Sequence, residues 1–161
     1  MAKRKRILYA EDNPSHQQIM TKWLSDYEVV VLDNPDDAYE FAAKAAHLGE
    51  PVDLFLLDIT LYQKHDPASR REWVYHDMPI DQGIALAKLL RKIPDYEDTP
   101  IIFLSAKLKL EEHREKLANR VRAICLQKPV PYARLQELLT DLLGTPEKGT
   151  WQKLASWIGW E

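Results

Sequence analysis

The chain has 161 residues, of which 45% are hydrophobic, and this is enough for one domain with its own core. Its 22 Lys and Arg are balanced by 25 Asp and Glu, so the net charge of -3 does not favour binding to nucleic acid or to an acidic membrane surface. A single cysteine, Cys125, excludes a disulfide framework, and the five histidines lack the paired spacing of a structural zinc site. No apolar stretch approaches about 18 residues, so we expect a soluble, cytoplasmic protein with no membrane partner.

Five short apolar runs follow one another along the chain and are predicted to be strands. They cover residues 6–10, 28–32, 52–57, 100–105 and 123–127. Because each run is apolar almost throughout, we expect these strands to be buried on both faces, as in a parallel sheet covered by helices.

The segments between the strands have helical period and carry typical end signals. Asn13 and Asn34 are N-cap candidates, and each precedes a proline, Pro14 or Pro35, that suits the first helical position. Gly49 is expected to end the second of these helices. The boundaries of two helices are therefore indicated by residue type alone.

Each predicted helix has an apolar face. The residues expected on these faces are Ile19, Met20, Trp23 and Leu24 in the first helix, Ala38, Phe41, Ala42 and Ala45 in the second, and Leu135, Leu138, Leu139 and Leu142 in the fifth. A third helix is predicted over about 82–93, ended by Pro94. A fourth, over about 109–121, is mostly charged and should be the most exposed.

The alternation of strands and helices predicts an α/β fold. Right-handed crossovers wind a (βα)5 alternation into a doubly wound, five-stranded parallel sheet with helices on both faces. One domain is expected over residues 1–143. Residues 144–161 are predicted to be a linker and a Trp-rich tail.

Polar residues stand where the predicted strands end. Glu11 and Asp12 follow the first strand, Asp58 the third, Ser105 ends the fourth, and Lys128 follows the fifth. Ligands of open parallel sheets bind beyond the carboxyl ends of the strands, so we expect these side chains to share one edge. The sequence thus places three carboxylates, a hydroxyl and an ammonium in one candidate site.

This combination of groups points to a cation and to phosphoryl chemistry. Two carboxylates ~4 Å apart repel by about 4 kcal/mol at an effective dielectric near 20, so three together require a positive charge. Oxygen ligands at an open cleft suit Mg2+ better than zinc. With Mg2+ and Lys128 neutralising phosphoryl oxygens, the Asp58 carboxylate could attack in line and form an acyl phosphate.

Five motifs occur in the order "YAEDN", "LFLLD", "MPIDQG", "IIFLSA" and "LQKP". In this respect the chain resembles the receiver domain of two-component response regulators, over roughly residues 6–143. The resemblance implies a flavodoxin-like sheet with strand order 2-1-3-4-5. It also implies a phosphoacceptor protein with slow self-dephosphorylation rather than a conventional enzyme.

The same resemblance implies a role for each site residue. Asp58 would accept a phosphoryl group from a sensor histidine kinase or a phosphotransfer protein, Ser105 would sense it, and Lys128 would pair with it. The Mg2+ ligands implied are Glu11, Asp12, Asp58 and the backbone carbonyl of Thr60. The bond between Lys128 and Pro129 would be cis.

The sequence departs from the family pattern in two places. Pro79 stands twenty-one residues after Asp58 instead of four, so an insertion of about seventeen residues is indicated. We place it at about 61–76, as a lid, a partner-contact loop or a solvent loop. Cys125 occupies the position, three before Lys128, where the family commonly has an aromatic switch residue, and is expected to be a buried small hydrophobe.

The sequence does not identify the downstream target of the protein or the way in which it signals. We expect a stand-alone regulator that signals by contact with an unidentified protein target or by phosphorelay, and the alternative is a receiver-like interaction module that works without phosphate. In the tail, Trp151, Leu154 and Ile158 share one helical face. This face would either pack on the domain itself or form a homodimer or target contact.

Overall fold

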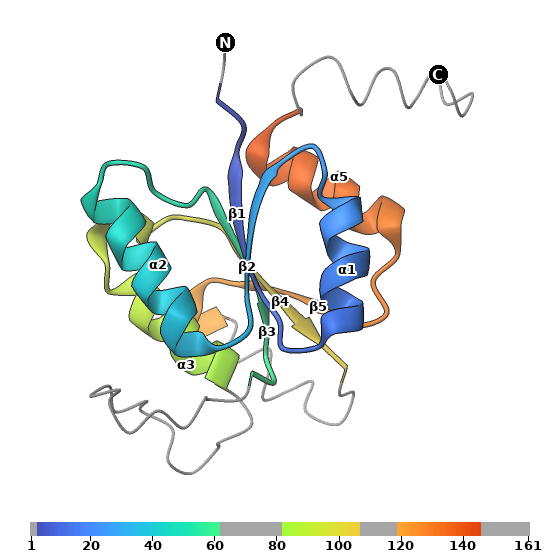
Figure 1. Ribbon diagram of the computed structural model, residues 1–161, viewed down its shortest axis with the longest axis horizontal. Helices are drawn as coiled ribbons and strands as arrows, with labels where there is room; N and C mark the ends of the chain where they lie inside the picture. The colour runs from blue at the N-terminus through green and yellow to red at the C-terminus, as the bar shows by residue number, and fades with distance from the viewer. Residues whose placement is uncertain (1–2, 62–81, 107–118, 146–161) are drawn as a thin grey trace.

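The computed structural model describes residues 3–61, 82–106 and 119–145 (Figure 1). Apart from Leu61, the predicted insertion lies outside the described residues. So do most of the predicted fourth helix, of which residues 119–121 are described and helical, and the Trp-rich tail.

The centre of the fold is a five-stranded parallel sheet with the order β2-β1-β3-β4-β5. Its strands are β1 Arg6–Ala10, β2 Glu28–Leu32, β3 Leu54–Asp58, β4 Ile101–Ser105 and β5 Ile124–Gln127. The predicted strands and the strand order are confirmed, and the boundaries differ by at most two residues.

The register of the sheet brings the strand ends to one edge. Ala10 pairs with Leu57, Asp58 with Leu104, and Ser105 with Gln127. Because all neighbours are parallel, residues that follow these positions emerge side by side, which is what a shared site requires.

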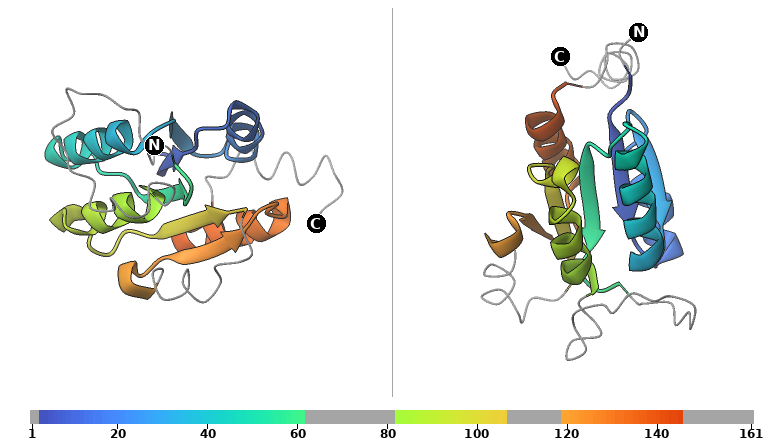
Figure 2. Two further views of the ribbon diagram at one scale, coloured as in Figure 1. Left: turned by 90° about the horizontal axis from the view of Figure 1, so that it is seen from below. Right: turned by 90° about the vertical axis from the view of Figure 1, so that its left-hand side faces the viewer.

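Helices cover both faces of the sheet (Figures 1 and 2). The helices described are α1 Pro14–Trp23, α2 Pro35–His47, α3 Gln82–Arg91, the 3-10 helix η1 Pro94–Tyr96, and α5 Tyr132–Leu143. One buried cluster joins α2 and α3 to alternate residues of β1, β3 and β4, and a second joins α1 and α5 to the intervening residues. The predicted doubly wound architecture is therefore confirmed.

The predicted caps are present. The Asn13 side chain accepts from the backbone N–H of Ser15 and His16, and the Asn34 side chain accepts from that of Asp37. Gly49 follows α2 with φ +75, a left-handed conformation that glycine adopts without strain.

Three burial expectations are wrong. Ile19 is 51% exposed, because the buried side of α1 is carried by Met20 and, just past the helix, Leu24. β2 is half-buried and β5 is largely exposed, since each lies at an edge of the sheet with a strand partner on one side. Cys125, on β5, is accordingly exposed rather than buried.

Candidate functional site

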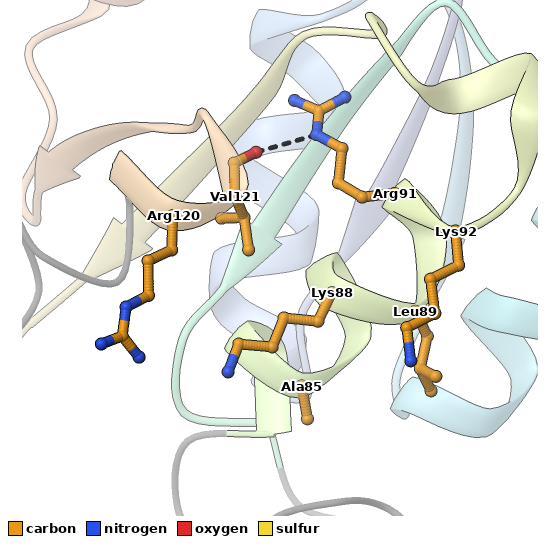
Figure 3. Close-up of a pocket in the computed structure, with 7 residues that line it drawn as sticks. All are labelled: Ala85, Lys88, Leu89, Arg91, Lys92, Arg120 and Val121. Atoms are coloured by element: carbon orange, nitrogen blue, oxygen red, sulfur yellow. Dashed lines mark hydrogen bonds between the residues drawn. The ribbon is translucent and has the colours of Figure 1, made fainter.

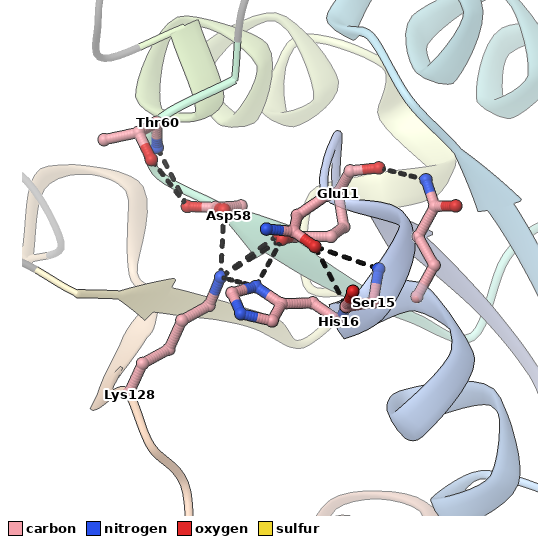
Figure 4. A network of polar contacts seen from close by, with 8 residues as sticks. Glu11, Ser15, His16, Asp58, Thr60 and Lys128 are labelled. Atoms are coloured by element: carbon pink, nitrogen blue, oxygen red, sulfur yellow. Dashed lines mark hydrogen bonds and ion pairs between the residues drawn. The ribbon is translucent and has the colours of Figure 1, made fainter.

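The strand ends gather Glu11, Asp58 and Lys128 into one polar network (Figure 4). The Lys128 ammonium Nζ lies 3.0 Å from Asp58 Oδ2 and 3.2 Å from Glu11 Oε2. Glu11 is 1% exposed and Asp58 4%, so one cation is shared by two buried carboxylates. The predicted convergence of residues from β1, β3 and β5 is present.

A third carboxylate completes an acidic cluster. Oxygens of Glu11, Asp12 and Asp58 lie within 4.8 Å of one another. Hard oxygen donors at this separation form a ligand set that fits Mg2+, which also retains waters at a partly open site.

Asp58 is held at both oxygens. The backbone N–H and the hydroxyl of Thr60 donate to Oδ1 at 3.0 and 3.1 Å, while Lys128 holds Oδ2. Thr60 therefore reaches Asp58 through its N–H and its hydroxyl, whereas its carbonyl, the group implied as a metal ligand, stays a prediction.

The two buried carboxyl groups, Glu11 and Asp58, have pKa values that are shifted in opposite directions. Burial and the adjacent Asp58 raise the pKa of Glu11 to about 8, although Lys128 opposes the rise. Burial would also raise the pKa of Asp58, but the Glu11 carboxyl, Lys128 and the Thr60 N–H together hold it below its usual range. At neutral pH, Asp58 is therefore the ionised member of the pair.

Ser105 and the turn after β5 close the site. Ser105 is buried at the end of β4, and its carbonyl accepts a 2.7 Å hydrogen bond from the Lys128 backbone N–H. The expected cis peptide between Lys128 and Pro129 is present. The role of the Ser105 hydroxyl stays a prediction.

No family model matches the chain. Among curated proteins, it is 36% identical over 74 residues to the transcriptional regulatory protein AruR of Pseudomonas aeruginosa. The matched segment covers 45% of this chain and 30% of AruR. It is 26% identical over 133 residues to the signal transduction histidine-protein kinase BarA of Escherichia coli, which is 83% of the chain and 12% of BarA. The chain thus spans less than a third of these longer relatives.

Solved structures match almost the whole fold. The chemotaxis protein CheY4 of Vibrio cholerae gives a TM-score of 0.65 at 24% identity, covering 87% of this chain and 99% of that one. The BeF3-activated receiver domain of Klebsiella pneumoniae RstA gives 0.63 at 26% identity, over 88% and 100%. The chain has the fold of a CheY-like receiver domain. The receiver domain of the P. aeruginosa histidine kinase PA1611, solved with magnesium in its active-site cleft, gives 0.63 at 22% identity, over 89% and 100%.

Sequence reasoning missed two side chains of this receiver site. His16 Nδ1 lies 2.8 Å from Glu11 Oε1, and Gln17 Nε2 donates to the Glu11 carbonyl at 2.6 Å. Both residues belong to the first turn of α1, and the predicted cap at Asn13 places that turn directly behind the acidic pair. That spacing is the signal that could have found them.

Gly83 in the "MPIDQG" motif has a backbone role in the receiver fold. Its N–H donates to the Ile59 carbonyl at 3.0 Å, and a Cβ at this position would lie 2.0 Å from the Asp58 carbonyl oxygen. A glycine is therefore required for α3 to begin against the end of β3.

A separate cavity of about 240 Å³ lies between α3 and the residues that precede β5 (Figure 3). Its lining residues are Ala85, Lys88, Leu89, Arg91, Lys92, Arg120 and Val121. The carboxylate site has no residue in this lining, so the two features are distinct.

Across the described part of the receiver fold, no helix is long and apolar enough to cross a bilayer.

Proposed function

We propose that this chain is a response-regulator receiver domain that accepts a phosphoryl group on Asp58 in a Mg2+-dependent reaction. The observation that carries the proposal is the Lys128 ammonium, 3.0 Å from Asp58 Oδ2, beside the cluster of Glu11, Asp12 and Asp58. A nucleophilic carboxylate, a fixed cation and a set of oxygen ligands at one sheet edge are the groups that phosphoryl transfer needs.

Asp58 is the nucleophile in this proposal. Its lowered pKa keeps the carboxylate ionised, and the Thr60 donors fix its orientation through Oδ1. One carboxylate oxygen forms a bond to phosphorus as the phosphorus–nitrogen bond of a phosphohistidine breaks. The electron pair of that bond returns to the donor imidazole.

Lys128 and a metal ion would stabilise the transferred group. Lys128 can turn from the carboxylates to the phosphoryl oxygens, where developing charge needs a donor. Glu11, Asp12 and Asp58 would hold Mg2+, which when bound neutralises charge on the phosphoryl oxygens. The magnesium in the cleft of the PA1611 receiver domain supports this assignment.

The partners follow from the chemistry of the acceptor. We propose a sensor histidine kinase or a phosphotransfer protein as the donor, and the similarity to a segment of the kinase BarA supports it. We further propose that the protein acts in the cytoplasm. Its output would be a protein contact, including one with a second copy of the chain, because the near-neutral charge does not favour nucleic acid.

The test is phosphorylation by a small acyl-phosphate donor, followed by intact-protein mass. With magnesium we expect one added phosphate on the wild type and none on Asp58→Asn. EDTA should abolish the addition. A wild type that gains no phosphate under any of these conditions would favour the alternative of a receiver-like interaction module that works without phosphate.

A further inference from the structure

The first turn of α1 folds back onto the Glu11 carboxylate (Figure 4). His16 Nδ1 lies 2.8 Å from Glu11 Oε1, and the next residue, Gln17, bonds the Glu11 backbone carbonyl. The Glu11 side chain is 1% exposed, whereas that of His16 is 47% exposed. One buried carboxylate is thus fixed by a neighbour that solvent can reach.

We infer that His16 is a positioning residue for the cation site, a statement that rests on the proposed Mg2+ site. An ionised Glu11, which is the form that binds a metal ion, can only accept hydrogen bonds, so the imidazole donates to it from Nδ1. A donor behind a ligating carboxylate fixes the orientation of that ligand, and loss of such a donor typically weakens metal binding 10- to 100-fold.

His16 and Lys128 both contact the Oε1 atom of Glu11. The Lys128 Nζ lies 3.3 Å from Glu11 Oε1 and 3.3 Å from His16 Nδ1. Ammonium and imidazole N–H are both donors, so their approach is not itself a favourable bond while Glu11 is ionised. If the ammonium moved away to admit a cation, the bond from His16 would still hold Glu11 in place.

The experiment is Mg2+ titration by calorimetry on the full chain. His16→Ala should raise the dissociation constant about tenfold. His16→Asn should stay within about threefold of the wild type, because the asparagine amide places a donor close to the position of Nδ1. His47→Asn removes an exposed histidine from the end of α2 and should leave the constant unchanged. Thermal melting of all three variants checks that each is folded.

The Mg2+ affinities of the variants decide whether His16 positions Glu11, and the phosphorylation result separates this role from the proposed function. Equal Mg2+ affinity in wild type and folded His16→Ala would overturn the positioning role. A loss in His16→Asn as large as in His16→Ala would also contradict it, since a donor at Nδ1 would then not suffice. A wild type that binds Mg2+ but gains no phosphate on Asp58 would sink the proposed function and leave this inference standing. A wild type that does not bind Mg2+ would overturn both.

Discussion

At the scale of single residues, the site is centred on one ammonium between two buried carboxyl groups. Lys128 contacts both Glu11 and Asp58, and its side chain is 16% exposed. Removing one partner of a buried ion pair leaves an uncompensated charge, so the position of Asp58 as well as its chemistry depends on Lys128.

Lys128→Ala should therefore lose most of the phosphorylation rate. Loss of a single preorganised donor to developing charge typically costs about 10²- to 10³-fold in rate, and we expect a decrease in this range. Initial rates with an acyl-phosphate donor at saturating magnesium measure it. Lys128→Arg, which keeps the charge, should lose less, and a Lys128→Ala protein that reacts at the wild-type rate would refute the role of the ammonium.

Magnesium affinity should rise with pH. The pKa of Glu11 is raised to about 8, so below that pH a bound proton must leave before Mg2+ can use this carboxylate. The dissociation constant should fall as pH rises from 6 towards 8, by up to about tenfold per pH unit, and then level off. Calorimetric titrations at several pH values measure the trend, and an affinity that is constant from pH 6 to 8 would contradict it.

The sequence predicted some of these residues and missed others for a physical reason. Asp58 and Lys128 could be predicted because the ends of parallel strands share one edge of the sheet, whatever side chains surround them. His16 joins the site through side-chain contacts with Glu11 and Lys128 from the first helical turn. Periodicity and strand order do not encode these contacts, and only the cap at Asn13 indicates which turn lies behind the acidic pair.

At the scale of elements, the end of β3 and the start of α3 approach so closely that a side chain cannot fit between them. The atoms that a Cβ on Gly83 would meet are backbone atoms of Asp58 and Ile59. Backbone cannot rotate away as a side chain can, so the strand or the helix would have to shift.

Gly83→Ala should destabilise the protein and disturb the acceptor. Overpacking of this kind typically costs about 1–3 kcal/mol, and we expect a loss of at least this size in the free energy of unfolding, with slower phosphorylation of Asp58. Denaturant titration measures the loss. Gly49→Asn is the control, because Gly49 has open space around it and asparagine tolerates a positive φ. Equal stability of Gly83→Ala and the wild type would contradict the close packing.

Arg91 connects α3 to the two segments that lead into β4 and β5. Its guanidinium donates to the carbonyls of Tyr96 and Thr99 before β4, and to that of Val121 before β5. A planar guanidinium can satisfy several carbonyls at once, which a lysine ammonium cannot do in the same geometry.

Arg91→Lys should therefore lower stability without removing any site residue. Carbonyls left without a donor cost about 1–3 kcal/mol when fully buried. Because the Arg91 bonds are part-buried, we expect a loss of about 1 kcal/mol in the free energy of unfolding. Arg134→Lys, on the exposed face of α5, is the matched control and should have little effect. If both variants unfold at the same denaturant concentration, Arg91 does not connect these elements.

At the scale of the whole molecule, the fold was predictable because two patterns agree. The apolar runs predicted the strands to within two residues, and the cap signals at Asn13 and Asn34 predicted where α1 and α2 begin. Edge burial was not predictable, since an apolar run looks the same in a central strand as in β5. The insertion at about 61–76 and the tail stay predictions, because they lie almost wholly outside the described residues.

Asp58 is the proposed phosphoacceptor of this fold. After reaction with an acyl-phosphate donor, borohydride reduces an aspartyl phosphate to homoserine, so peptide mass spectrometry can locate the modified residue. We expect homoserine at position 58, formed with magnesium and absent with EDTA. Modification of Asp12 or another carboxylate instead, or modification at position 58 that proceeds equally well in EDTA, would contradict a Mg2+-dependent acceptor at Asp58.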